Sequence, residues 1–102
     1  MKVVGVTACP SGVAHTYMAA EALKLAGDKA GVEVLIETQG GAGIENELTE
    51  KDIKEAACVV LSNDVAIRGE ERFHGKKVVR MSVTDLMNKA DVLMKKITDT
   101  FQ

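Results

Sequence analysis

The sequence predicts an α/β protein with three layers (αβα): a four-stranded, mostly parallel sheet between helices, in a flavodoxin-like (Rossmann-like) topology. The order of the elements along the chain indicates this class. Short apolar runs alternate with segments of helical periodicity, and parallel neighbours in a sheet need such helical crossovers. The right-handedness of these crossovers narrows the topology further. We expect one domain spanning residues 1–102, because the chain is too short for two.

The expected strands are runs of mostly β-branched residues at 2–7, 32–38, 57–62 and 77–82. The first run is almost unbroken in its apolar character, which is typical of a strand covered on both faces. Charged residues in the second and fourth runs predict greater exposure, at the edges of the sheet. Cys58 stands in the apolar third run, and we expect it to be a buried thiol.

Three segments carry helix signals. Apolar residues recur at helical spacing over residues 18–30, and Gly31 is placed to end that helix. Near residue 50, Thr49 and Asp52 have the spacing of a capping box. A single apolar stripe over residues 86–101 predicts one last helix.

Composition and charge exclude several classes of protein. Thirteen Lys and Arg against 15 Asp and Glu give a net charge of -2, and one Tyr with two Phe offers few aromatic rings, so we expect no nucleic-acid partner. The longest apolar runs are too short to span a bilayer. A strand pattern begins at once, so we expect no signal peptide and a reducing compartment for the two cysteines.

The loop after the first strand carries the chemistry. Cys9 ends the strand, Pro10 prevents its continuation, and Gly12 permits a tight turn before a helix that begins around residues 14–16. Unpaired N–H groups and the helix dipole at such a start form an anion site, and the same field favours the thiolate of Cys9. A thiolate can attack phosphorus there while the N–H groups hold the phosphoryl oxygens, so the loop predicts covalent phosphoryl transfer.

The spacing within this loop supports that prediction. Five residues separate Cys9 from His15, and low-molecular-weight tyrosine phosphatases use Cys, five residues, Arg and then Ser or Thr in the same position. With His15 in place of Arg, we expect phosphate binding without a bidentate guanidinium and without a metal or cofactor. A hydroxyl of the loop can bond the sulfur or the phosphate. The predicted phosphate-binding loop is Pro10, Ser11, Gly12, Val13, Ala14, His15 and Thr16.

Other residues follow strands at the same edge of the sheet, where ligands bind in this topology. They are either flexible connections or a surface for a partner: Gln39, Gly40, Asn63 and Asp64. Arg68 lies in the loops and short helical turn expected for residues 63–76. Its side chain can turn toward a phosphate, although two neighbouring glutamates offer simpler partners.

The run from Cys9 to Glu21, CPSGVAHTYMAAE, resembles the active-site signature of the fructose-type IIB components of the bacterial phosphoenolpyruvate-dependent sugar phosphotransferase system (PTS). That family most often has Thr where Ser11 stands and Ile where Val13 stands, and both changes are mild. The resemblance continues through residues 37–40, 43–49 and 71–73 and so covers nearly the whole chain.

This resemblance implies a cytoplasmic phosphocarrier that acts as a phosphotransferase. In the family it resembles, the cysteine matching Cys9 accepts a phosphoryl group from a phosphohistidine on a IIA domain. It then passes the group to a sugar bound by the membrane-embedded IIC component. The implied partners are therefore a phosphorylated IIA and a IIC with fructose or a fructose-like sugar.

Two other functions use the same loop geometry. One is a small cysteine phosphatase or arsenate reductase. The missing Arg counts against it, as does the lack of an Asp-Pro acid loop, since Pro10 is the only proline. The other is a non-catalytic regulatory module that binds phosphate or a partner protein.

Overall fold

The computed structural model describes residues 1–8, 13–41 and 43–101. Five strands form one sheet in the order β3-β2-β1-β4-β5, and all but β3 run parallel. The parallel strands are β1 (Lys2–Ala8), β2 (Glu33–Gly40), β4 (Cys58–Ser62) and β5 (Val78–Met81), and the antiparallel strand is β3 (Gly43–Glu45). The α/β class and the flavodoxin-like order of the parallel strands are confirmed. The predicted count of four strands lacked β3, which is too short to show an alternating pattern.

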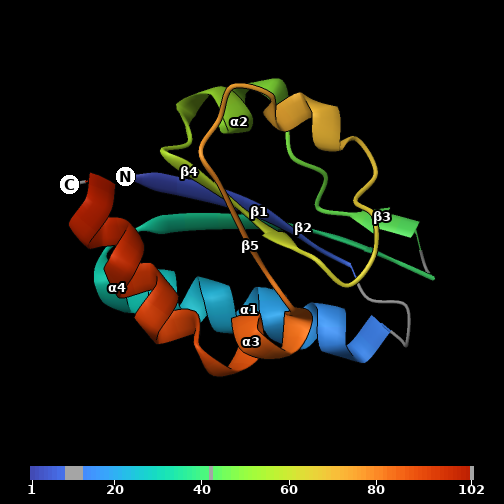
Figure 1. Ribbon diagram of the computed structural model, residues 1–102, viewed down its shortest axis with the longest axis horizontal. Coiled ribbons are helices and arrows are strands. Elements are labelled where there is room, and N and C mark those ends of the chain that lie inside the picture. The colour runs from blue at the N-terminus through green and yellow to red at the C-terminus, as the bar shows by residue number, and fades with distance from the viewer. Residues whose placement is uncertain (9–12, 42, 102) are drawn as a thin grey trace.

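Helices cover both faces of the sheet (Figure 1). On one face lie α1 (Val13–Ala30), α3 (Val83–Asn88) and α4 (Ala90–Phe101), and on the other lie α2 (Glu50–Glu55) and the 3₁₀ helix η1 (Glu70–Phe73). Successive strand residues point to opposite faces, so Val3 packs in the first layer and Val4 in the second. No helix in the described ranges has the length and apolar character needed to cross a membrane.

Two of the predicted helix signals are confirmed. The Thr49 hydroxyl accepts a hydrogen bond from the Asp52 N–H at 3.1 Å, and the Asp52 carboxylate accepts one from the Thr49 N–H, which completes the capping box of α2. Gly31 has a φ of 73° and ends α1, a conformation that glycine adopts without a steric penalty.

The prediction of a single last helix over 86–101 was wrong. The helix is interrupted at Lys89, which separates α3 from α4, and no proline or glycine marks the bend. Leu86 before the bend and Leu93 and Ile97 after it all remain buried in the same core as α1. The apolar stripe thus stays in the core on both sides of the interruption.

The expectation that charge marks edge strands holds for only one of the two runs. β5 is an edge strand, and its Arg80 is exposed. β2 lies inside the sheet between β1 and β3, and its Glu37 is fully buried, so the predicted exposure of this run was wrong there. Cys58 is fully buried, as predicted, and this burial raises the pKa of its thiol.

The centre of the sheet predicts the first measurable effect. A Cβ added at Gly5 would lie 2.6 Å from the carbonyl oxygen of Val60 on the neighbouring strand. Because that oxygen belongs to the backbone of β4, we expect Gly5→Ala to lower the free energy of unfolding by about 1–3 kcal/mol. Gly41→Ala is the control, since a Cβ there meets no atom within 4 Å. Equal unfolding free energies for the two variants in urea would contradict this close packing.

Candidate functional site

The end of β1 is held firmly at the edge where the predicted loop begins. The Ser62 hydroxyl accepts a hydrogen bond from the Ala8 N–H at 2.9 Å and donates one to the Ala8 carbonyl at 3.1 Å. Both backbone groups of the residue before Cys9 are therefore fixed to the end of β4. The predicted nucleophile and the next three loop residues (Cys9, Pro10, Ser11 and Gly12) lie outside the described residues.

The rest of the predicted loop forms the first turn of α1. The helix begins at Val13. Ala14 and His15 are exposed, whereas Thr16 is buried. The Thr7 hydroxyl of β1 donates a hydrogen bond to the Thr16 carbonyl at 3.1 Å, which ties this turn to the sheet. The Thr16 hydroxyl is buried and has no hydrogen-bond partner among the described residues. Leaving a buried hydroxyl unpaired is costly, so this group is suited to a ligand that can pair with it.

A cavity of about 220 Å³ opens at the same edge of the sheet. Its walls come from the end of β1, from the adjoining ends of β2 and β3 and from the loop before η1. Ala8, Gly40 and Arg68 represent these three segments in the lining. The cavity therefore lies beside the residue that precedes Cys9 in the sequence.

The four residues predicted as a partner surface differ in their surroundings. Gln39 is buried, and both ends of its side-chain amide are hydrogen-bonded. Asp64 accepts a hydrogen bond from the Val83 N–H at 2.7 Å and so holds the start of α3. Gly40 and Asn63 are exposed. Two of the four thus have a structural role, and the partner surface stays a prediction.

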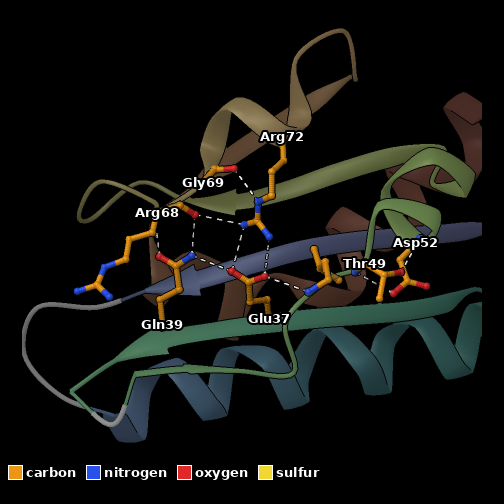
Figure 2. Close-up of polar contacts among 8 residues, drawn as sticks. Glu37, Gln39, Thr49, Asp52, Arg68, Gly69 and Arg72 are labelled. Carbon is orange, nitrogen blue, oxygen red and sulfur yellow. Dashed lines mark hydrogen bonds and ion pairs between the residues drawn. The ribbon is translucent and has the colours of Figure 1, made fainter.

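A buried carboxylate organises this edge of the molecule (Figure 2). Glu37 accepts two hydrogen bonds from Arg72, from Nη1 at 2.8 Å and from Nη2 at 3.1 Å. The Leu48 N–H donates a third at 3.0 Å, and Gln39 Nε2 donates a fourth at 2.8 Å. Both carboxylate oxygens are therefore fully engaged, as a buried charge requires.

The same network fixes the backbone of the loop that precedes η1. Gln39 donates to the Arg68 carbonyl and accepts from the Arg68 N–H, both at 2.9 Å. Arg72 donates to the Gly69 carbonyl at 2.6 Å and to the Arg68 carbonyl at 3.2 Å. The ion pair thus joins β2 to residues 68–72, which line the cavity through Arg68.

The hydrogen bonds decide the charge state of this carboxylate. Burial alone would raise the pKa of Glu37, but the bonds from Arg72, Gln39 and the Leu48 N–H outweigh it and hold the pKa below its ordinary value. The pKa of Arg72 is raised in turn, chiefly by its hydrogen bonds to Glu37. Arg72 also lies over the Phe73 ring, with 4.9 Å from Cζ to the ring centroid.

The sequence pattern did not reveal this network. Glu37 continues an apolar run, and a charge in such a run indicates either an edge strand or a buried ion pair. No local signal names its partner, because Arg72 is 35 residues away in the chain. The sequence placed Glu37 in a strand and Gln39 and Gly40 at its end, but it did not connect them to Arg72.

The family model described as "PTS system, Lactose/Cellobiose specific IIB subunit" matches residues 4–96. The chain belongs to the PTS IIB family. It is 55% identical over 96 residues to the "PTS system fructose-like EIIB component 2" of Escherichia coli K12, covering 94% of this chain and 91% of that protein. A solution structure of an Enzyme IIB subunit of the PTS from Escherichia coli K12 matches with a TM-score of 0.91 and 42% identity, covering 97% of this chain and 92% of that one.

These comparisons confirm the resemblance to fructose-type IIB components. A further relative of this IIB chain is the "PTS system 2-O-alpha-mannosyl-D-glycerate-specific EIIABC component" of Escherichia coli K12. It is 45% identical over 92 residues, which cover 90% of this chain and 14% of that protein. The family model and these relatives are named for different sugars, so membership of the IIB family does not by itself identify the sugar.

Breaking the buried ion pair should destabilise this IIB chain. Glu37→Gln keeps the shape of the side chain but leaves the Arg72 guanidinium without its counter-charge. We expect the free energy of unfolding to fall by about 2–3 kcal/mol, less than for a fully buried pair, because the Arg72 side chain is 24% exposed. Glu70→Gln is the control, since its pair with Arg80 is exposed and should matter much less. Similar losses for the two variants in urea unfolding would contradict a special role for Glu37.

The lowered pKa of Glu37 also predicts a pH dependence. At pH values below the ordinary pKa of 4.5, the unfolded chain binds a proton that the folded carboxylate does not. The stabilisation from this group is therefore complete above that pH and is lost as the pH falls through the folded pKa. We expect the difference in unfolding free energy between wild type and Glu37→Gln to stay constant from neutrality down to about pH 4.5 and to shrink as the pH falls further. A difference that stays constant below that pH as well would contradict the lowered pKa.

Proposed function

We propose that this IIB chain is a cytoplasmic phosphocarrier with Cys9 as the phosphorylated residue. It accepts the group from a phosphohistidine of a IIA protein and passes it to a sugar bound by a membrane IIC component. The observation that carries the proposal is the run from Cys9 to Thr16, which joins the end of β1 to the first turn of α1 in a member of the PTS IIB family.

The first transfer uses the thiolate of Cys9. The sulfur attacks phosphorus, an S–P bond forms, and the N–P bond of the phosphohistidine breaks with its electron pair returning to the imidazole nitrogen. In the second transfer, a sugar hydroxyl oxygen attacks phosphorus and loses its proton to water, the S–P bond breaks with its electron pair on sulfur, and the thiolate is restored. Each step exchanges one bond to phosphorus for another, so the chemistry needs positioning and charge stabilisation above all.

The surrounding loop supplies that stabilisation in this proposal. The backbone N–H groups of residues 11–16 bind the phosphoryl oxygens, while Pro10 has no N–H and serves only to end the strand. The Thr16 hydroxyl supports this role, because it is buried in the first turn of α1 and has no hydrogen-bond partner within the part of the chain that the structure describes. His15 is exposed in the same turn and can donate to the phosphate or meet the partner protein.

The sugar in this proposal is fructose or a fructose-like sugar. The support is the 55% identity to a protein named as a fructose-like EIIB component, which covers most of both chains. The sugar itself would be bound by the IIC component, so the IIB chain needs no sugar pocket of its own.

The proposed carrier role predicts that phosphorylation depends on one of the two cysteines. Incubation with a phosphorylated IIA protein should label wild type and Cys58→Ala alike, because Cys58 is buried in the core. Cys9→Ser should lose the label, since a hydroxyl is far less nucleophilic than a thiolate at neutral pH. Mass spectrometry of the intact protein measures the added phosphoryl group. Labelling of Cys9→Ser at the wild-type level would refute the assignment, and rapid hydrolysis of an aryl phosphate would favour a phosphatase instead.

A further inference from the structure

Arg68 has an unusually well-fixed backbone for an exposed residue in a loop. Its N–H donates to Gln39 Oε1, and its carbonyl accepts from Gln39 Nε2 and from Arg72 Nη2. Gln39 and Arg72 are themselves held by the buried carboxylate of Glu37. The buried network therefore fixes the backbone from which the Arg68 side chain extends, although the side chain itself takes no part in the network (Figure 2).

The guanidinium of Arg68 has no acidic partner among the residues that the structure describes. Glu70, one of the two glutamates expected to pair with it, is paired with Arg80 instead. Among the described residues, no ion pair or side-chain hydrogen bond involves the Arg68 guanidinium. Figure 2 shows the side chain extending away from the Glu37 network, toward the end of β1. Within residues 1–8, 13–41 and 43–101, its N–H donors thus have no side-chain or backbone acceptor and are suited to an anion.

The cavity of about 220 Å³ lies between Arg68 and the end of β1. Arg68 lines one wall and Ala8, the residue before Cys9, lines another. Ala8 is fixed by Ser62 and Arg68 by Gln39, so both walls are anchored. A cation held beside a cavity at the carboxyl end of β1 is suited to a small, highly charged anion.

From these contacts we infer that Arg68 is a further catalytic residue, whose guanidinium binds the phosphoryl group carried on Cys9. The inference rests on the proposed function. It supplies the bidentate donor that the loop lacks, because His15 stands where tyrosine phosphatases have Arg. Arg68 contacts the non-bridging oxygens, stabilises their charge in both transfers, and neither forms a covalent bond nor gives up a proton. Gln39 is the positioning residue that holds it.

The test compares three variants of the full chain with wild type. Arg68→Gln removes the charge, Arg68→Lys keeps it without the planar fork, and Arg80→Gln removes an exposed arginine that does not line this cavity. The first readout is protection of Cys9 from iodoacetamide by inorganic phosphate, followed by mass spectrometry. The second is the rate of phosphoryl transfer from phosphorylated IIA. Thermal unfolding should be unchanged in Arg68→Gln, because its backbone bonds to Gln39 do not involve the substituted side chain.

Arg68→Gln is expected to raise the phosphate concentration for half-protection by about tenfold to a hundredfold, the range for losing a charged hydrogen bond. Its transfer rate should fall as well, Arg68→Lys should recover part of both losses, and Arg80→Gln should match wild type. Equal protection in Arg68→Gln and Arg80→Gln would overturn the inference. Slower transfer by Arg68→Gln with unchanged protection would also overturn it, because Arg68 would then contact the partner protein and not the phosphate. Lack of protection in wild type would overturn it too.

The two proposals fail in different ways. If phosphorylated IIA labels Cys9 equally well in wild type and Arg68→Gln, and phosphate protection is also equal, Arg68 has no catalytic role and the carrier function stands. If phosphorylated IIA never labels Cys9 but phosphate protection still depends on Arg68, the carrier function fails and the anion site stands.

Discussion

The buried ion pair between Glu37 and Arg72 is the constraint on which this edge of the molecule depends. A carboxylate with no exposed surface must find several donors, and Glu37 finds them in Arg72, Gln39 and the Leu48 N–H. Satisfying that one charge brings together β2, the segment before α2 and the loop before η1. Through Gln39 and Arg72, this buried group fixes the backbone of Arg68, which lines the cavity beside β1.

A second set of contacts fixes the opposite wall. Ser62 binds both backbone groups of Ala8, and Thr7 binds the carbonyl of Thr16, so β1, β4 and the first turn of α1 form one unit. Short hydroxyl side chains suit this task, because they bond backbone groups without needing space. The predicted loop therefore begins and ends on rigid elements, which is the arrangement that a precise transfer reaction needs.

Much of the fold could be predicted because its signals are local. The apolar runs predicted the four parallel strands, Gly31 predicted the end of α1, and Thr49 with Asp52 predicted the start of α2. The misses have physical reasons too. β3 has only three residues and depends on pairing with β2. The interruption at Lys89 is marked by no helix-breaking residue, so the local sequence did not predict it. The strand that holds Glu37 was wrongly predicted to be exposed, because a charge in a strand does not reveal its distant partner.

By itself, the sequence determined the α/β class, the buried Cys58, the likeness to IIB components and the position of the candidate loop after β1, because each is written in neighbouring residues. Only the tertiary structure decided that Glu37 is buried, that Gln39 and Asp64 hold other segments in place, and that Arg68 shares a cavity with Ala8. These facts depend on residues far apart in the chain, and such contacts exist only once the sheet has brought their strands and loops to one edge.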